Sequence, residues 1–219
     1  MLFCLASIFV ASGVSLIFLI YFAMKNSQQL IASIAGSISW LIALSIISLV
    51  WLVLPFSHQH YVLIIYSFII TEVIRFTTLI GIHYFTKKFD EIKLVGFGLG
   101  VGAAVCQVLI HNVPYLLLST GDADLYLLNP IIGNFTVVAF NGFCYSVYLI
   151  CSYTSLSLLL HRNKKDIIYS IIFVSLHGAI LVAGIMNYYV SVYLGITLML
   201  LIDIITVIMT FIILYHYRH

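Results

Sequence analysis

Seven long stretches of apolar residues fill most of this chain, and they constrain its fold more than any other feature. Hydrophobic residues make up 63% of the 219 positions and charged residues only 7%, a balance that is typical of polytopic membrane proteins and excludes soluble classes. Each stretch is long enough to cross about 30 Å of hydrocarbon as a helix. The predicted fold is therefore all-α, a single domain over residues 1–219 built as a bundle of seven transmembrane helices. The expected spans are 2–24, 30–55, 61–85, 94–118, 130–160, 167–187 and 189–215.

The positions of lysine and arginine predict how these helices are oriented. Eight of the nine basic residues follow the first, third, fifth and seventh stretches, and the ninth, Arg75, lies inside the third. Cytosolic loops are enriched in lysine and arginine, so the N-terminus is expected in the lumen or outside the cell and the C-terminus in the cytosol. The first stretch has neither a basic leading region nor a small-residue cleavage site, and we expect it to be retained as a helix.

The fourth stretch opens with a glycine-rich sequence at residues 94–106, which we call the glycine segment. Such a sequence would weaken a helix in water, but lipid forces the backbone to stay helical, and small residues then let neighbouring helices approach closely. At about 100° per residue the small residues form two strips on nearly opposite sides, Gly96, Gly100 and Ala104 on one and Gly98 and Gly102 on the other. We expect helices to pack on both strips, and the spacing leaves open whether they belong to this chain or to a partner.

The second stretch carries a small-residue face and two tryptophans. Gly36, with serines beside it, predicts close packing against another helix. Trp51 lies near the end of the stretch and suits the lumenal interface of the membrane. Trp40 lies about three turns deeper, so it is expected to pack against another helix or in a pocket without a cofactor instead.

Charged and titratable residues inside the spans form a candidate polar site. Glu72 and Arg75 are three residues apart and can pair on one face of a helix, which matters because an isolated charge at mid-membrane costs about 2.5–3.5 kcal/mol. His177 and Asp203 lie at a similar depth in the sixth and seventh stretches. A structural ion pair is one interpretation of Glu72 and Arg75. A polar pathway or an anchor for a partner is the other. The unbalanced charge of all four residues is the main argument from the sequence for proton-coupled transport, and a satisfied polar core with one protonated acid is the more common alternative.

Motifs for catalysis, metal binding and receptor signalling are absent from the sequence. It contains no G-x-G-D, G-x-S-G, H-E-x-x-H, Walker or dinucleotide-binding pattern, so we interpret the chain as non-catalytic and expect no metal, cofactor or nucleic acid. All four cysteines lie in apolar stretches and predict neither disulfides nor a zinc site. The paired lumenal cysteines and the N-P-x-x-Y sequence of G-protein-coupled receptors are missing as well.

A set of short motifs runs through the chain in a fixed order. They are Ala35-Gly36, Trp40-Leu41 and Val50-Trp51, then Glu72-Val73 and Arg75-Phe76, then Gly96, Gly100 and Ala104, then Gly121-Asp122 and Tyr126, and last His177. Taken together they resemble the anterior-pharynx-defective subunit of γ-secretase. The chain is similar to a divergent member of that family, since its fifth stretch lacks the family's second intramembrane histidine and Asp203 is not typical of the family.

The resemblance implies a non-catalytic scaffold of the γ-secretase intramembrane protease complex. Such a subunit assembles and stabilises presenilin with nicastrin and a small presenilin-enhancer subunit, for the proteolysis of type I membrane proteins, and the catalytic aspartates belong to presenilin. The resemblance also implies a multi-pass protein embedded in the lipid of endoplasmic reticulum, Golgi, endosomal and plasma membranes. The alternative that the residues themselves suggest is a small proton-coupled transporter using Glu72, Arg75, His177 and Asp203.

Overall fold

The computed structural model describes residues 2–21, 26–53, 60–85, 89–112, 135–161, 167–189 and 191–216. Within these ranges the chain is helical almost throughout and has no strand, so the all-α prediction is confirmed. The elements are α1 (Leu2–Tyr21), α2 (Ser27–Val53), α3 (His60–Phe85), α4 (Phe89–Gln107), the π-helix η2 (Val108–Asn112), α6 (Phe135–His161), α7 (Ile167–Tyr189) and α8 (Val192–His216). The motif at Gly121-Asp122 and Tyr126 lies outside the described residues.

Six of the described helices are long and apolar enough to cross a membrane, namely α2, α3, α4, α6, α7 and α8. The protein is therefore an integral multi-pass membrane protein. The fourth helix starts earlier than the sequence suggested, at Phe89 rather than near residue 94, and it runs directly into η2. The last part of the expected fourth span, 113–118, is not among the described residues.

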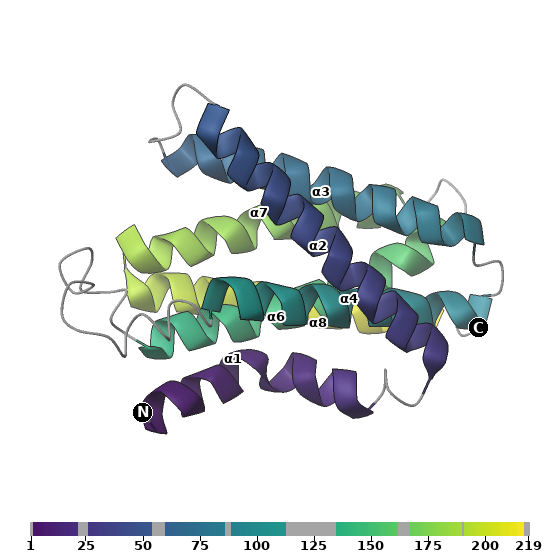
Figure 1. Cartoon of the computed structure of the whole chain (residues 1–219), viewed down its shortest axis with the longest axis horizontal. Helices are drawn as coiled ribbons and strands as arrows, with labels where there is room; N and C mark the ends of the chain where they lie inside the picture. The colour runs from purple at the N-terminus through teal and green to yellow at the C-terminus, as the bar shows by residue number, and fades with distance from the viewer. Residues whose placement is uncertain are drawn as a thin grey trace.

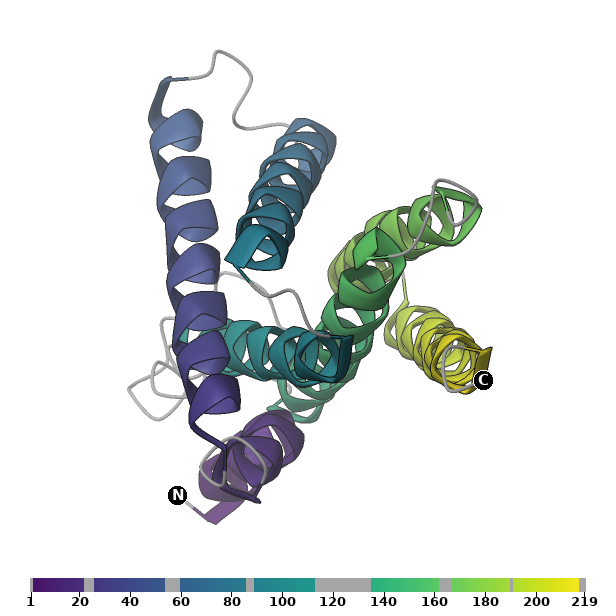
Figure 2. The ribbon, with the colours of Figure 1, turned by 90° about the vertical axis from the view of Figure 1, so that its right-hand side faces the viewer.

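Helices α4 and α6 form the centre of the bundle. Figure 2 shows both lying between the other helices, with α2 against α4 and with α1, α7 and α8 around α6. Burial agrees with this arrangement, since 67% of the α4 span and 78% of the α6 span are buried, against 22–33% in the other four spans. The core follows from sequence, because these two helices carry small residues that allow neighbours to approach on several sides.

Many serine and threonine side chains in the spans donate to carbonyls of their own helices, whereas Ser37 and Ser155 donate to a neighbouring helix. Ser33 donates to the Gln29 carbonyl at 2.9 Å, and Thr206 donates to the Ile202 carbonyl at 2.7 Å. Bonds of this kind, four residues back along the helix, let a hydroxyl lie in an apolar environment without a partner from another element. The polar residues of the spans are therefore compatible with a lipid-embedded bundle.

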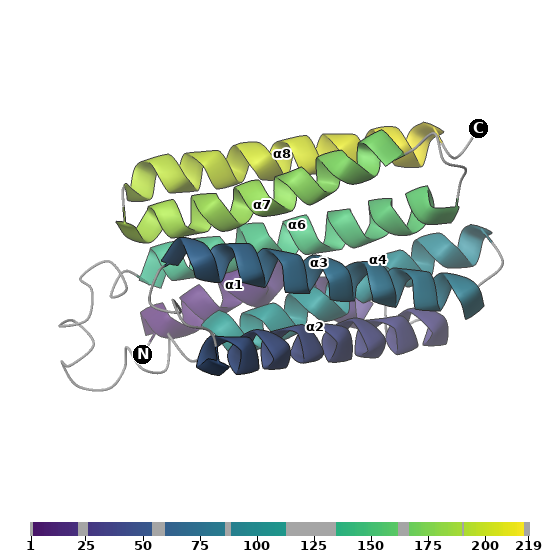
Figure 3. The same cartoon turned by 90° about the horizontal axis from the view of Figure 1, so that it is seen from above.

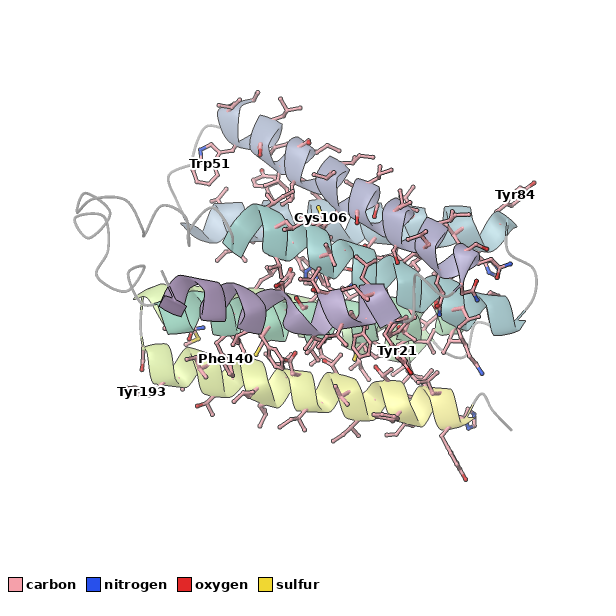
Figure 4. The ribbon with its side chains drawn as sticks, turned by 60° about the horizontal axis from the view of Figure 1, so that its bottom comes forward. Tyr21, Trp51, Tyr84, Cys106, Phe140 and Tyr193 are labelled. Atoms are coloured by element: carbon pink, nitrogen blue, oxygen red, sulfur yellow. The ribbon has the colours of Figure 1, made fainter. Side chains whose placement is uncertain are left out.

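The helices run roughly side by side along the bundle (Figures 1 and 3). Helix α1 begins at one end of the bundle, and α8 finishes at the opposite end. Exposed aromatic residues lie toward both ends. Figure 4 shows Trp51 and Tyr193 near one end and Tyr84 near the other, and all three are exposed. Aromatic rings at both ends of a bundle are typical of the two membrane interfaces.

Candidate functional site

The candidate site is a buried group of three residues, Glu72, Arg75 and His177, which we call the polar cluster. Glu72 and Arg75 come from consecutive turns of α3, and the Arg75 Nη2 donates to Glu72 Oε2 at 2.5 Å. The other carboxylate oxygen, Oε1, is hydrogen-bonded to Nδ1 of His177 on α7. The structure thus forms the predicted Glu72–Arg75 pair and adds His177 to it from a distant part of the chain.

Arg75 extends from α3 across to α6, where it meets two hydroxyls. Its Nη1 donates to Tyr148 Oη at 3.0 Å and to Ser152 Oγ at 3.2 Å. The Tyr148 hydroxyl in turn donates to the Phe173 carbonyl of α7 at 2.8 Å. The cluster and its partners therefore join three helices, α3, α6 and α7, through hydrogen bonds between side chains or from side chain to backbone.

Two tyrosines of α6 surround the His177 ring. Tyr145 Oη lies 2.7 Å from His177 Nε2, and the Tyr148 ring is stacked on the imidazole with centroids 5.4 Å apart. Sequence reasoning did not identify these tyrosines as site residues, because aromatic residues in an apolar stretch most often indicate core or lipid contact. The available signal was the spacing of Tyr145, Tyr148 and Ser152, which places three hydroxyls on one face of a helix.

The three residues of the polar cluster are buried, so their pairing has a large effect on the free energy of unfolding. Arg75 is 1% exposed, His177 1% and Glu72 7%, so the charges are removed from both lipid and water. A buried ion pair is stable only where geometry is good and hydrogen bonds satisfy the remaining polar atoms. Here both Glu72 oxygens, both His177 nitrogens and both terminal Arg75 nitrogens have partners. The arrangement suits a structural tie between helices.

Asp203 lies apart from the polar cluster. Its carboxyl group is on α8 beside the Cys144 thiol of α6, and neither of its oxygens meets a hydrogen-bond partner among the described residues. Asp203 is nevertheless buried, at 6% exposure. The structure therefore brings together three of the four intramembrane residues and leaves the fourth at the α6–α8 contact.

The first strip of the glycine segment faces α6. A Cβ added to Gly100 would lie 2.7 Å from the Ile150 Cα, and one added to Gly96 would meet the Ser157 side chain and the Tyr153 carbonyl. Ala104, the third member of the strip, is fully buried. At these positions α4 and α6 approach so closely that a larger side chain would collide with backbone.

The second strip faces α2. A Cβ on Gly98 would lie 2.6 Å from the Gln29 carbonyl oxygen, and one on Gly102 would meet the Ser33 backbone. The contact is reciprocal, because a Cβ on Gly36 of α2 would lie 2.9 Å from the Leu99 Cα. Both strips of the glycine segment are thus occupied by helices of this chain.

The two tryptophans differ as their depths suggest. Trp40 is 3% exposed, and its indole Nε1 donates to Gln107 Oε1 of α4 at 2.7 Å, while its ring packs near Tyr145. Trp51 is 43% exposed at the end of α2. Trp40 therefore belongs to the α2–α4 contact, and Trp51 lies on the outer surface.

The described residues contain no group of three or more histidine, cysteine, aspartate or glutamate residues placed to hold a metal ion. The polar cluster offers hydrogen bonds and a balanced ion pair, and its members are already bonded to one another.

In comparisons with known proteins, no protein-family model and no curated protein matches the chain.

Proposed function

We propose that this chain is a non-catalytic scaffold subunit of a γ-secretase-type intramembrane protease complex, which assembles presenilin with nicastrin and a small presenilin-enhancer subunit. The observation that carries the proposal is the contact between Glu72 and His177, which are 105 residues apart. Both were singled out as separate motifs of the resemblance. Two motif residues from distant parts of the chain therefore lie in one buried cluster.

The other described motif residues of the spans also support the proposal. Gly36 and Trp40 of α2, and Gly96 and Gly100 of α4, all lie at contacts of the central helix α4. These four residues of the resemblance belong to the interior, whereas Trp51, another motif residue, is exposed. A scaffold needs a rigid bundle, and close contacts at small residues supply it.

The proposal places partners on other surfaces than the glycine segment. Both strips are already covered by α2 and α6, so no further helix has access to them. Replacing Gly100 with leucine, which would be the obvious test of a partner interface, therefore tests the bundle itself. Partner contacts of the proposed scaffold lie on the outward faces of the peripheral helices.

Seven crossings with a lumenal N-terminus complete the proposed topology. Helix α1 has 20 residues, which at 1.5 Å per residue corresponds to about 30 Å, the thickness of the hydrocarbon layer. An odd number of crossings agrees with α1 starting and α8 ending at opposite ends of the bundle (Figure 3). The end at which α1, α3, α6 and α8 finish is the one near the basic residues, which supports a cytosolic C-terminus.

Epitope accessibility tests this topology. In cells permeabilised only at the plasma membrane, a tag after His219 should bind antibody on internal membranes, where a tag before Met1 should bind only after those membranes are also permeabilised. Equal access to both tags on internal membranes under the first condition would contradict seven crossings.

A proton-coupled transporter receives less support from the geometry. That function was suggested by four titratable or charged residues at one depth, but Asp203 is separate from the polar cluster, whose members bind one another. Purified protein in liposomes should show no pH-dependent solute uptake. Uptake that the Asp203→Asn variant abolishes would favour the transporter over the scaffold.

Depletion and rescue test the scaffold function in cells. Loss of this chain should lower the amounts of presenilin and nicastrin, together with the cleavage of a type I membrane substrate, and wild-type chain should restore all three. The Glu72→Gln variant should restore them poorly, whereas Thr77→Ala, at an exposed position on the same helix, should restore them fully. Unchanged partner amounts after depletion would overturn the proposal.

A further inference from the structure

The hydrogen-bond geometry of the polar cluster determines where most of its protons lie. Arg75 can only donate, so Tyr148 Oη and Ser152 Oγ are acceptors for its Nη1. Each hydroxyl uses its own proton on a carbonyl, Tyr148 on Phe173 and Ser152 on Leu149. Only the protons on His177 and Tyr145 remain to be assigned.

His177 has three possible states, and each predicts a different pattern. A neutral ring with its proton on Nδ1 donates to Glu72 and accepts the Tyr145 hydroxyl at Nε2. A neutral ring with its proton on Nε2 would instead direct the Nδ1 lone pair at the Glu72 carboxylate, which is repulsive. An imidazolium would donate at both nitrogens.

Charge distinguishes the first state from the third. Among the described residues, the charged groups facing this site are Glu72 and Arg75 of α3, and α6 contributes the neutral Tyr145, Tyr148 and Ser152. One carboxylate and one guanidinium cancel, so a neutral His177 leaves the cluster without net charge. An imidazolium would leave a net positive charge in a buried, water-excluded place, which is costly.

We propose that Tyr145 is a positioning residue that holds His177 as the neutral tautomer protonated on Nδ1, by donating its hydroxyl proton to Nε2. The hydrogen bonds then form one directed path, from Tyr145 through His177 to Glu72, where Arg75 also donates. Both ring nitrogens are then hydrogen-bonded within the chain, so neither nitrogen is available to another molecule. This assignment does not depend on which partners the chain has.

Nitrogen NMR of histidine side chains tests the assignment on the full-length protein in detergent micelles. With ¹⁵N-labelled histidine, the His177 signals are identified by their loss in the His177→Gln variant. At neutral pH the wild-type ring should give one protonated nitrogen, Nδ1, and one unprotonated nitrogen, Nε2, that accepts a hydrogen bond. Two protonated nitrogens, or a proton on Nε2, would overturn the proposal.

A pair of matched variants isolates the role of Tyr145. Tyr145→Phe keeps the ring and removes the donor, so the Nε2 signal should shift downfield while Nδ1 remains protonated. Tyr148→Phe removes a hydroxyl one turn away that bonds to Arg75 and Phe173 rather than to His177. In this variant the Nε2 signal should keep the position of an unprotonated nitrogen that accepts a hydrogen bond. An Nε2 signal that does not shift in Tyr145→Phe would contradict the assignment. The result does not depend on whether partner proteins bind the chain.

Discussion

At the scale of single residues, two acids at similar depth have opposite surroundings. Glu72 accepts from Arg75 and is bonded to His177, whereas the Asp203 oxygens have no hydrogen-bond partner in the described part of the chain. A carboxyl within a membrane span is tolerated only where it is paired or neutral. Substitution to the corresponding amide should therefore have very different effects at these two positions.

Glu72→Gln should destabilise the protein strongly. Removing one member of a buried ion pair leaves the other charge uncompensated, at a cost of about 3–5 kcal/mol. The measurement is the free energy of unfolding in mild detergent. A second variant that also carries Arg75→Met should recover part of the loss, because the stranded charge is then removed. A Glu72→Gln protein as stable as wild type would show that the pair is not a structural tie.

Asp203→Asn should cause no loss of stability beyond about 0.5 kcal/mol and can increase stability, because asparagine keeps the shape and has no ionised form to bury. The free energy of unfolding in mild detergent, measured for Asp203→Asn and Glu72→Gln under the same conditions, checks this expectation. A loss as large as that of Glu72→Gln would mean that the Asp203 carboxyl has an essential partner.

The sequence predicted part of this site, and the reason lies in distances along the helix. Spacing of three residues fixes Glu72 and Arg75 on one face, so their pairing followed directly. Depth in the membrane placed His177 and Asp203 at the same level but says nothing about the direction in which each helix faces. Packing makes His177 face α3 and Asp203 face α6, and that depends on the whole bundle.

At the scale of elements, α4 is the helix on which the arrangement depends. Its two strips were predictable from the angular spacing of glycines, as was packing on both sides. The identity of the neighbours was not, because small residues permit close approach without specifying what approaches. The structure assigns Gly100 to α6 and Gly102 to α2, both within the chain.

Gly100→Ala and Gly81→Ala should differ in sign. A methyl group on Gly100 would lie 2.7 Å from the Ile150 Cα, and such overpacking costs about 1–3 kcal/mol. Gly81 on α3 has open space around it, so alanine should be neutral or favourable there, since it favours the helix. Thermal unfolding of the two variants in one detergent gives the comparison. Equal tolerance at both sites would contradict close packing of α4 on α6.

At the scale of the whole molecule, the spans surround a closed interior and expose apolar surface to lipid. The outward face of α8, including Ile204, Ile208 and Phe211, is exposed and uncharged, as lipid contact requires. Inside the bundle, Arg75, Glu72, His177 and Tyr148 are joined by hydrogen bonds that cross between α3, α6 and α7. The scaffold that we propose would use this interior to keep its own helices in fixed positions.

Co-purification tests the scaffold most directly. The full chain, tagged at one end, is extracted from its native membranes in a mild detergent, and the chains bound to it are identified by mass spectrometry. We expect a presenilin-type aspartyl protease, nicastrin and a small enhancer subunit in amounts comparable to the tagged chain. A tagged chain that elutes alone, or only with copies of itself, would contradict it.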